Sequence, residues 1–254
     1  MFMIGLVKLE LKKIFSKKDI MIISSILILS PLVFGICMVN RIAGLNFNGQ
    51  ITVDAYGIMI WSFLKYLFVL YLMPIYLVCC FVGKEIESRS INIMLSNYDR
   101  KKVFAAKMTT YLITITIFFV LFHIVSMLTF SGLIHNTEFA LAGSGNTLTK
   151  NFFLYLFQWL ELLFVAIISY LLCCAIKGNA VLVLGIGVII LQKIVVNIEG
   201  VRRFLPFYIS DFNYYSMIPD GVLMNTNIIS CIIYTIIIMA TFCIALKMWS
   251  RKDF

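Results

Sequence analysis

Four ionisable side chains lie inside long apolar stretches of this 254-residue sequence: Lys65, His123, Glu161 and Lys193. An ionisable group at membrane depth is costly, and it normally pairs with another group or faces a cavity. Catalysis within a membrane would need paired carboxylates, a Ser/His pair or a cluster of metal ligands, and one glutamate with one histidine does not supply them. The sequence therefore predicts no catalytic residue, no cofactor site and no metal site in this chain.

The depths of these four side chains in the apolar stretches predict their interaction partners. A rise of about 1.5 Å per residue places all four in the outer half of their apolar stretches. We expect Glu161 to pair with Lys65 or Lys193 and to fix helix packing around an outward-facing polar substrate path. Two alternatives stay open: the lysines can extend to the outer headgroups, and a protonated Glu161 can hydrogen-bond to a neighbouring helix. His123 is expected to be packed and hydrogen-bonded rather than a ligand.

The elements that carry these residues are long enough to span a bilayer. The chain is 62% hydrophobic and 13% charged, which excludes an ordinary soluble domain. A spanning helix needs about 20 mainly apolar residues, and six segments fit: 20–39, 58–82, 108–134, 152–176, 180–197 and 228–246. Their continuous apolar character predicts an all-α integral membrane protein with six transmembrane helices in one domain, residues 1–254. Segment 180–197 is short and contains Gly185 and Gly187, so a broken helix is the alternative there.

Positive charge is distributed unevenly in this topology. Of the 21 Lys and Arg residues, only Arg41, Lys150, Arg202 and Arg203 fall in the loops of one side, and most of the others fall on the opposite side. Because cytosolic loops are enriched in Lys and Arg, we expect both termini in the cytosol. Topology and attraction to anionic membrane lipid account for the net charge of +9, so no nucleic-acid partner is expected. Frequent Ile, Lys and Asn residues are typical of a bacterium with an AT-rich genome and favour one with a single membrane, so the expected location is the bacterial plasma membrane.

Two amphipathic segments are expected on the cytosolic side. Residues 1–19 predict an interfacial helix, with apolar residues on one stripe and lysines off it. Residues 84–103 join the second and third spans, and their apolar residues follow an i, i+3, i+4, i+7 pattern on a short helix. That stripe consists of Ile91, Met94, Leu95 and Tyr98. It could rest on lipid headgroups or insert into a groove of a partner protein, and the sequence leaves both open.

The order of residues in this cytosolic segment is distinctive. Glu85 and Glu87 are followed by a polar turn from Ser88, by Met94-Leu95-Ser96, by the basic cluster Arg100-Lys101-Lys102 and by Ala106-Lys107. The pattern resembles that of the ABC-2 type transporter permeases, especially the six-helix subunits of bacteriocin, lantibiotic and bacitracin immunity exporters and related peptide exporters. The likeness in topology covers the whole chain. One departure is that Asn97-Tyr98-Asp99 replaces the proline common after the Leu-Ser pair.

The resemblance implies a coupling helix docked on a separate ATP-hydrolysing subunit. Its contact residues would be Glu85, Glu87, Arg89, Ile91, Met94, Leu95 and Tyr98. This chain contains no G-x-x-x-x-G-K-[ST] phosphate-binding loop, so ATP and Mg²⁺ would be bound by that partner. The implied assembly pairs two permease subunits, identical or different, with two ATPase subunits. The implied activity is the outward transport of amphipathic or antimicrobial peptides or similar membrane-active compounds.

A different class of function is also compatible with the sequence. Glu161 and the glycine-interrupted fifth segment would suit a secondary transporter or channel driven by an ion gradient.

An aromatic segment precedes the last span. Its candidate residues are Phe204, Pro206, Phe207, Tyr208, Phe212, Tyr214 and Tyr215. Such residues form at least an aromatic belt at the outer interface. In the resembled permeases this region is a short re-entrant or interfacial element that lines the outer gate, and the resemblance gives that role to these side chains. Interfacial anchoring alone is the alternative.

Overall fold

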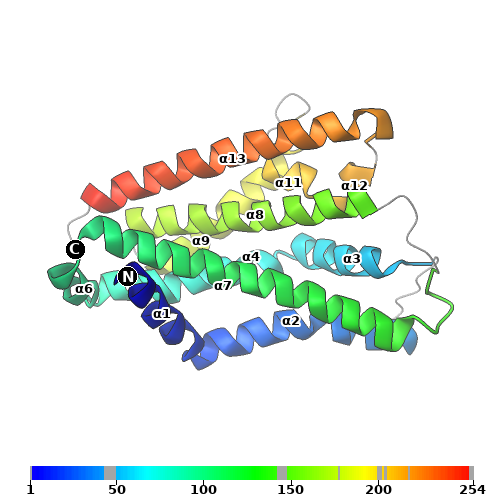
Figure 1. Cartoon of the computed structure of the whole chain (residues 1–254), viewed down its shortest axis with the longest axis horizontal. Coiled ribbons are helices and arrows are strands. Elements are labelled where there is room, and N and C mark those ends of the chain that lie inside the picture. The colour runs from blue at the N-terminus through cyan, green and yellow to red at the C-terminus, as the bar shows by residue number, and fades with distance from the viewer. Residues whose placement is uncertain are drawn as a thin grey trace.

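The structure is a computed structural model that describes residues 2–42, 50–141, 148–176, 178–198, 202, 205–216 and 218–251. Within these ranges the regular elements are helices, and the sole extended pairing is an isolated bridge between Ile51 and Ala140. The long helices lie side by side along the longest axis (Figure 1). The predicted all-α fold class is therefore confirmed for the described part of the chain.

Five helices in the described part are long and apolar enough to cross a membrane, which makes the chain a multi-pass membrane protein. They span Lys18–Val39, Val69–Glu87, Arg100–Ile134, Asn151–Ala175 and Gly221–Arg251. The first is α2 (Lys18–Val39), the third joins α7 (Arg100–Thr129) to the π-helical turn η3 (Phe130–Ile134), and the last two are α8 (Leu148–Ala175) and α13 (Asp220–Arg251). The predicted fifth segment, 180–197, is shorter. It is α9 (Gly178–Val195), whose apolar part covers Ala180–Val195.

The segment predicted as one continuous span, 58–82, is interrupted. It consists of α3 (Val53–Tyr66), α4 (Val69–Val78), the π-helical turn η2 (Cys79–Gly83) and α5 (Lys84–Glu87). Between α3 and α4, Phe68 adopts a left-handed backbone with φ 61°, a conformation that costs a bulky residue about 1–2 kcal/mol. We call Leu67–Phe68 the helix break. It removes helical partners from nearby backbone groups and makes them available to side chains.

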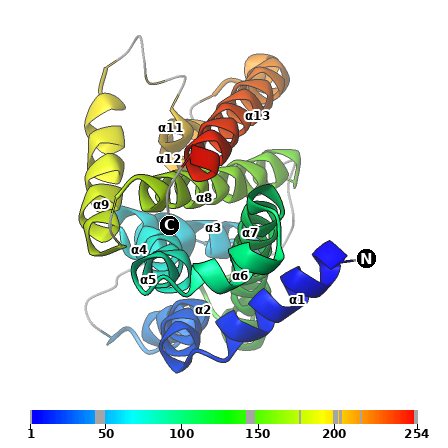
Figure 2. The ribbon, with the colours of Figure 1, turned by 90° about the vertical axis from the view of Figure 1, so that its left-hand side faces the viewer.

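Helix α9 packs along the C-terminal half of this interrupted segment. It contacts η2, α4 and α8. Gly185 allows a close approach, because a Cβ atom at this position would lie 3.1 Å from side-chain atoms of Ile75 on α4. Seen along the bundle, α9 is inclined to the long helices (Figure 2). Its last turn, at Lys193, reaches the level of the helix break, where Lys193 contacts Tyr66 and Phe68.

Two short helices follow at the level of α3. They are α11 (Pro206–Ile209), which packs on α8, and α12 (Phe212–Ser216), which contacts α3. Helix α8 ends toward the end of the bundle that carries α6 (Ile91–Asn97), whereas α13 begins at the opposite end (Figure 1). The chain between α8 and α13 therefore traverses the length of the bundle in two stages, first through α9 and then past α11 and α12.

The N-terminal helix and the end of α13 lie at the same end of the bundle as α6. Figure 1 places α1 (Phe2–Phe15), α6 and the C-terminal end of α13 together. Helix α1 packs on α7, and the indole N–H of Trp249 donates to the carbonyl of Arg100 at 3.1 Å. The sequence predicted that the N-terminal helix, the 84–103 segment and the C-terminal end of the chain lie on a common side. In this fold the described parts of all three lie at one end of the bundle. In the following we call it the α6 end.

Candidate functional site

A buried ion pair lies beside the helix break. Nζ of Lys65, near the end of α3, is 2.9 Å from Oε2 of Glu161 on α8, and the exposed fractions of their side chains are 1% and 2%. The prediction that Glu161 pairs with a lysine is confirmed, and the partner is Lys65. Because α3 begins at Val53, Lys65 lies about 18 Å from its start at 1.5 Å per residue. The pair is therefore nearer the middle of the bundle than the predicted boundary at residue 58 indicated.

Neutral hydrogen-bonding groups complete this ion pair. Lys65 Nζ also donates to Oγ of Ser210 at 2.6 Å and to the carbonyl of Phe207 at 3.1 Å. Ser210 Oγ in turn donates to Glu161 Oε2 at 2.5 Å. The hydroxyl of Tyr71, on α4, donates to Glu161 Oε1 at 2.5 Å. Buried charges are stable only with such compensation, and here it joins α3, α4, α8 and the end of α11.

Lys193 has a different role from the one expected. Its Nζ donates to the carbonyl of Tyr66 at 2.9 Å, on the α3 side of the helix break. The ammonium lies 3.8 Å from the ring centroid of Phe68 and 5.5 Å from that of Phe207, distances at which a cation is attracted to an aromatic face. Pairing of Lys193 with Glu161 was the alternative to Lys65, and the structure does not contain it.

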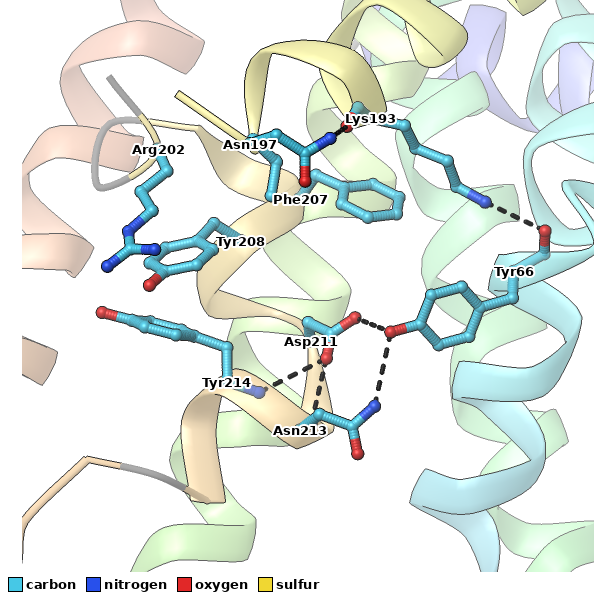
Figure 3. A pocket seen from close by; sticks show the side chains of 10 residues that line it. Tyr66, Lys193, Asn197, Arg202, Phe207, Tyr208, Asp211, Asn213 and Tyr214 are labelled. Carbon is cyan, nitrogen blue, oxygen red and sulfur yellow. Dashed lines mark hydrogen bonds between the residues drawn. The ribbon is translucent and has the colours of Figure 1, made fainter. Parts of the chain in front are cut away.

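A pocket of about 620 Å³ opens next to these residues, between α3, the end of α9 and the α11–α12 segment. Its lining combines cationic, aromatic and amide side chains (Figure 3), and consists of Tyr66, Lys193, Val196, Asn197, Arg202, Phe207, Tyr208, Asp211, Asn213 and Tyr214. We call it the break pocket. Its one carboxylate, Asp211, accepts from the Tyr66 hydroxyl and from the backbone N–H groups of Asn213 and Tyr214. Asp211 is thus occupied by donors of the protein itself.

The predicted outer gate residues fall into three groups. Phe207, Tyr208 and Tyr215 are buried, so they pack within the protein rather than forming only an interfacial belt. Phe212 is exposed and Tyr214 is half-buried. Pro206 begins α11, and Phe204 lies outside the described residues. The break pocket brings together Phe207, Tyr208 and Tyr214 from this set.

His123 occupies an aromatic enclosure. Its ring packs against Trp61, Phe119, Phe122 and Tyr155, with centroid distances between 4.5 and 5.4 Å. Among the described residues, neither ring nitrogen has a hydrogen-bond partner. The prediction of a packed histidine is confirmed, but the predicted hydrogen bond is absent from the described part of the structure. His123 also stands apart from the Lys65–Glu161 pair, which involves other side chains.

A second buried ion cluster lies at the α6 end and was not predicted. Lys107 Nζ, on α7, is 2.5 Å from Oε2 of Glu85 on α5 and 3.1 Å from Oε1 of Glu10 on α1. Lys13 pairs with the other carboxylate oxygen of Glu85. Burial, together with the nearby charge of Lys107, lowers the pKa of Lys13. This cluster, which we call the anchor cluster, ties α1, α5 and α7 together.

The apolar stripe of the predicted coupling helix faces the protein's own core. Ile91 is completely buried, and Met94, Leu95 and Tyr98 are partly buried against the same core. Docking of the stripe on lipid or in a partner groove stays a prediction, because Met94, Leu95 and Tyr98 are only partly covered by the core. The burial of Glu85 in the anchor cluster removes that residue from the surface. The segment is also two short helices, α5 and α6, joined by a turn with Arg89 at φ 55°. Its exposed face carries Glu87, Arg89 and Ile93, the last 70% exposed.

Comparisons with known proteins add no further constraint. No family model matches the chain, and no curated protein matches it in sequence. Among the described residues, no three His, Cys, Asp or Glu side chains come together as a metal site would require. The interpretation of the site therefore depends on its residues alone.

Proposed function

We propose that this chain is the membrane-spanning subunit of an exporter driven by a separate ATPase, resident in a bacterial plasma membrane with both termini in the cytosol. The observation that carries the proposal is the way in which α6 packs on the rest of the protein. Its inner face is packed into the core through Ile91, and α5 before it is held by Glu85 in the anchor cluster. On its outer face, Ile93 is 70% exposed. A partner that pushed on this face would act directly on α7, and through α5 on η2.

Six membrane crossings fit this proposal. An even number is required when α1 and the end of α13 occupy one end of the bundle (Figure 1). Five crossings are supplied by the long apolar helices, and α9 with the α11–α12 segment would supply the sixth as a composite. In that arrangement α11 and α12 would form the re-entrant element, and Ser210, directly after α11, would connect it to the Lys65–Glu161 pair.

The transported compounds are proposed to be amphipathic peptides or similar membrane-active molecules that leave through the region of the helix break. Irregular backbone at membrane depth is tolerated where it lines a cavity, and it commonly marks a transport site. The break pocket supplies such a cavity next to Phe68 and Lys193. The functional unit would contain two permease subunits and two ATPase subunits, which bind ATP and Mg²⁺.

Photo-crosslinking in native membranes tests the docking face. A photoreactive residue at Ile93 is expected to capture an ATP-binding protein. The matched control is the same residue at Leu128, which is 67% exposed on the membrane-spanning helix α7 and is expected to capture lipid. The proposal fails if Ile93 yields no ATP-binding protein, or if the adducts at both positions are the same.

One observation favours a second candidate, an ion-gradient-driven transporter. The Lys65–Glu161 pair lies at a helix break in mid-bundle, an arrangement that also suits coupling to an ion. The two candidates differ in their energy source. Collapse of the proton and sodium gradients at constant ATP would stop transport by a secondary transporter, and it would leave transport by an ATP-driven exporter intact.

A further inference from the structure

We infer that the break pocket binds the phosphate or carboxylate headgroup of an acidic amphiphile, whose apolar tail lies along the exposed face of α9. This inference rests on the proposed transport function and narrows its substrate to an acidic class. It also predicts that the purified chain binds such an amphiphile in the absence of an ATPase.

The charges in the pocket favour an anion. Lys193 and Arg202 both line it (Figure 3). Among the described residues, neither of them lies within 4.0 Å of a carboxylate oxygen, since the ion pairs present involve other cations. The single carboxylate of the lining, Asp211, already accepts from Tyr66, Asn213 and Tyr214. The pocket therefore contains two positive charges and one carboxylate that is already hydrogen-bonded. An oxyanion would complement the excess positive charge.

The aromatic side chains hold the two cations in place without neutralising them. The guanidinium carbon of Arg202 lies 5.2 Å from the ring centroid of Tyr208, and the ammonium of Lys193 lies over Phe68. Figure 3 shows the two cations on opposite sides of Phe207 and Tyr208. In addition, Nε of Arg202 is buried and has no hydrogen-bond partner among the described residues. A cation held by a ring still has donors available for a ligand oxygen.

The surroundings favour a ligand with an apolar tail over a free anion. On α9, Ile190, Leu191 and Ile194 flank Lys193 in sequence and are between 43% and 59% exposed. An acyl or isoprenoid chain could lie on this surface while its headgroup occupies the pocket. A cationic amphiphile would instead meet Lys193 and Arg202, and like charges in a partly dehydrated site repel.

Binding to the purified full chain tests the inference. In a neutral detergent, dodecyl phosphate is expected to raise the thermal unfolding midpoint in a saturable manner, and dodecyltrimethylammonium is expected to have no such effect. Each cation facing an anionic headgroup contributes about fivefold in affinity, so Lys193→Gln with Arg202→Gln should weaken binding about thirtyfold. The single change Arg202→Gln leaves the Lys193–Tyr66 contact intact and should weaken binding about fivefold.

Two controls test whether binding depends on the position of the charges and on the apolar tail. Lys247→Gln with Arg251→Gln removes the same charge from exposed positions on α13 and should leave binding unchanged. Unchanged binding in the pocket variants, or equal stabilisation by the cationic amphiphile, would overturn the inference. Inorganic phosphate distinguishes the two sources of the anion: if it displaces dodecyl phosphate at similar concentrations, the site recognises a free anion and the amphiphile is wrong. None of these results depends on the presence of an ATPase, so the exporter proposal stands or falls separately.

Discussion

The ammonium of Lys65 and the carboxylate of Glu161 are 2.9 Å apart and almost completely shielded from solvent, beside the helix break. The two residues come from α3 and α8, and the groups that complete the pair come from α4 and the end of α11. Any movement of α4 or of the α11–α12 segment relative to α3 would disturb this contact. The pair would therefore respond to a relative movement of these elements.

Removal of one member of this pair should destabilise the protein strongly. Lys65→Met leaves Glu161 buried without its cation, and Glu161→Gln does the converse, so each should lower the free energy of unfolding by about 3–5 kcal/mol. The combined change Lys65→Met with Glu161→Met should recover most of that loss, because buried pairs are often replaceable by apolar side chains. Unfolding in mixed micelles measures these values. The control Lys193→Met, at a half-buried site, should cost much less, and equal losses for Lys193 and Lys65 would contradict the pairing.

The left-handed backbone at Phe68 can be separated from the packing of its side chain. Phe68→Ala and Phe68→Gly both remove the ring that faces Lys193, but only glycine relieves the backbone conformation. Phe68→Gly should therefore be more stable than Phe68→Ala by about 1 kcal/mol in the same unfolding assay. Ordinary helical backbone would give the opposite order, since glycine is the poorer helix former by about 1 kcal/mol.

The anchor cluster should hold α1 and α5 against α7. Lys107→Met removes the cation shared by Glu85 and Glu10 and leaves two buried carboxylates. We expect faster proteolysis and faster hydrogen exchange within α1, with a loss of stability of about 3 kcal/mol or more. Lys102→Met provides the control at an exposed position on the same helix. Unaltered exchange in α1 after Lys107→Met would show that the cluster does not anchor it.

The aromatic enclosure of His123 makes a prediction about activity as well as stability. Both ring nitrogens lack partners among the described residues, and burial of unpaired polar atoms is unfavourable by about 1–3 kcal/mol. His123→Leu should therefore be as stable as the parent chain or more stable, and it should keep transport. Loss of transport by a stable His123→Leu variant would show that the imidazole takes part in the substrate path.

The sequence predicted the ion pair and the helices for clear physical reasons. A lone carboxylate within an apolar stretch needs a partner, which led to Glu161 with Lys65 or Lys193. Long apolar runs can satisfy their backbone in lipid only as helices. Ser210 and Tyr71 escaped prediction because neutral hydroxyl residues are common and nothing in their local sequence indicates a distant charge. The shared buried position of Lys107 and Glu10 was hidden for a related reason, because both lie among many exposed charges in the segments at the α6 end.

Two features show where periodicity stops being informative. The i, i+3, i+4, i+7 pattern of Ile91, Met94, Leu95 and Tyr98 correctly indicated one apolar helix face, but a period cannot say which surface covers that face. The helix break at Leu67–Phe68 is equally invisible, since both residues are apolar and the nearest proline, Pro74, lies within α4. The packing of α9, α11 and Lys193 around the break holds it in place, and that packing is a property of the whole fold.

The most direct test of the proposed function is the ATP hydrolysis that co-purifies with the chain from its native membranes. The parent chain should bring down an ATPase. Ile93→Arg, on the exposed face of α6, should reduce the co-purified activity by about tenfold or more, whereas Ser16→Arg, at an exposed site between α1 and α2, should not. Absence of ATPase activity with the parent chain, or equal activity with both variants, would contradict the account of α6 as the docking element of an ATP-driven exporter.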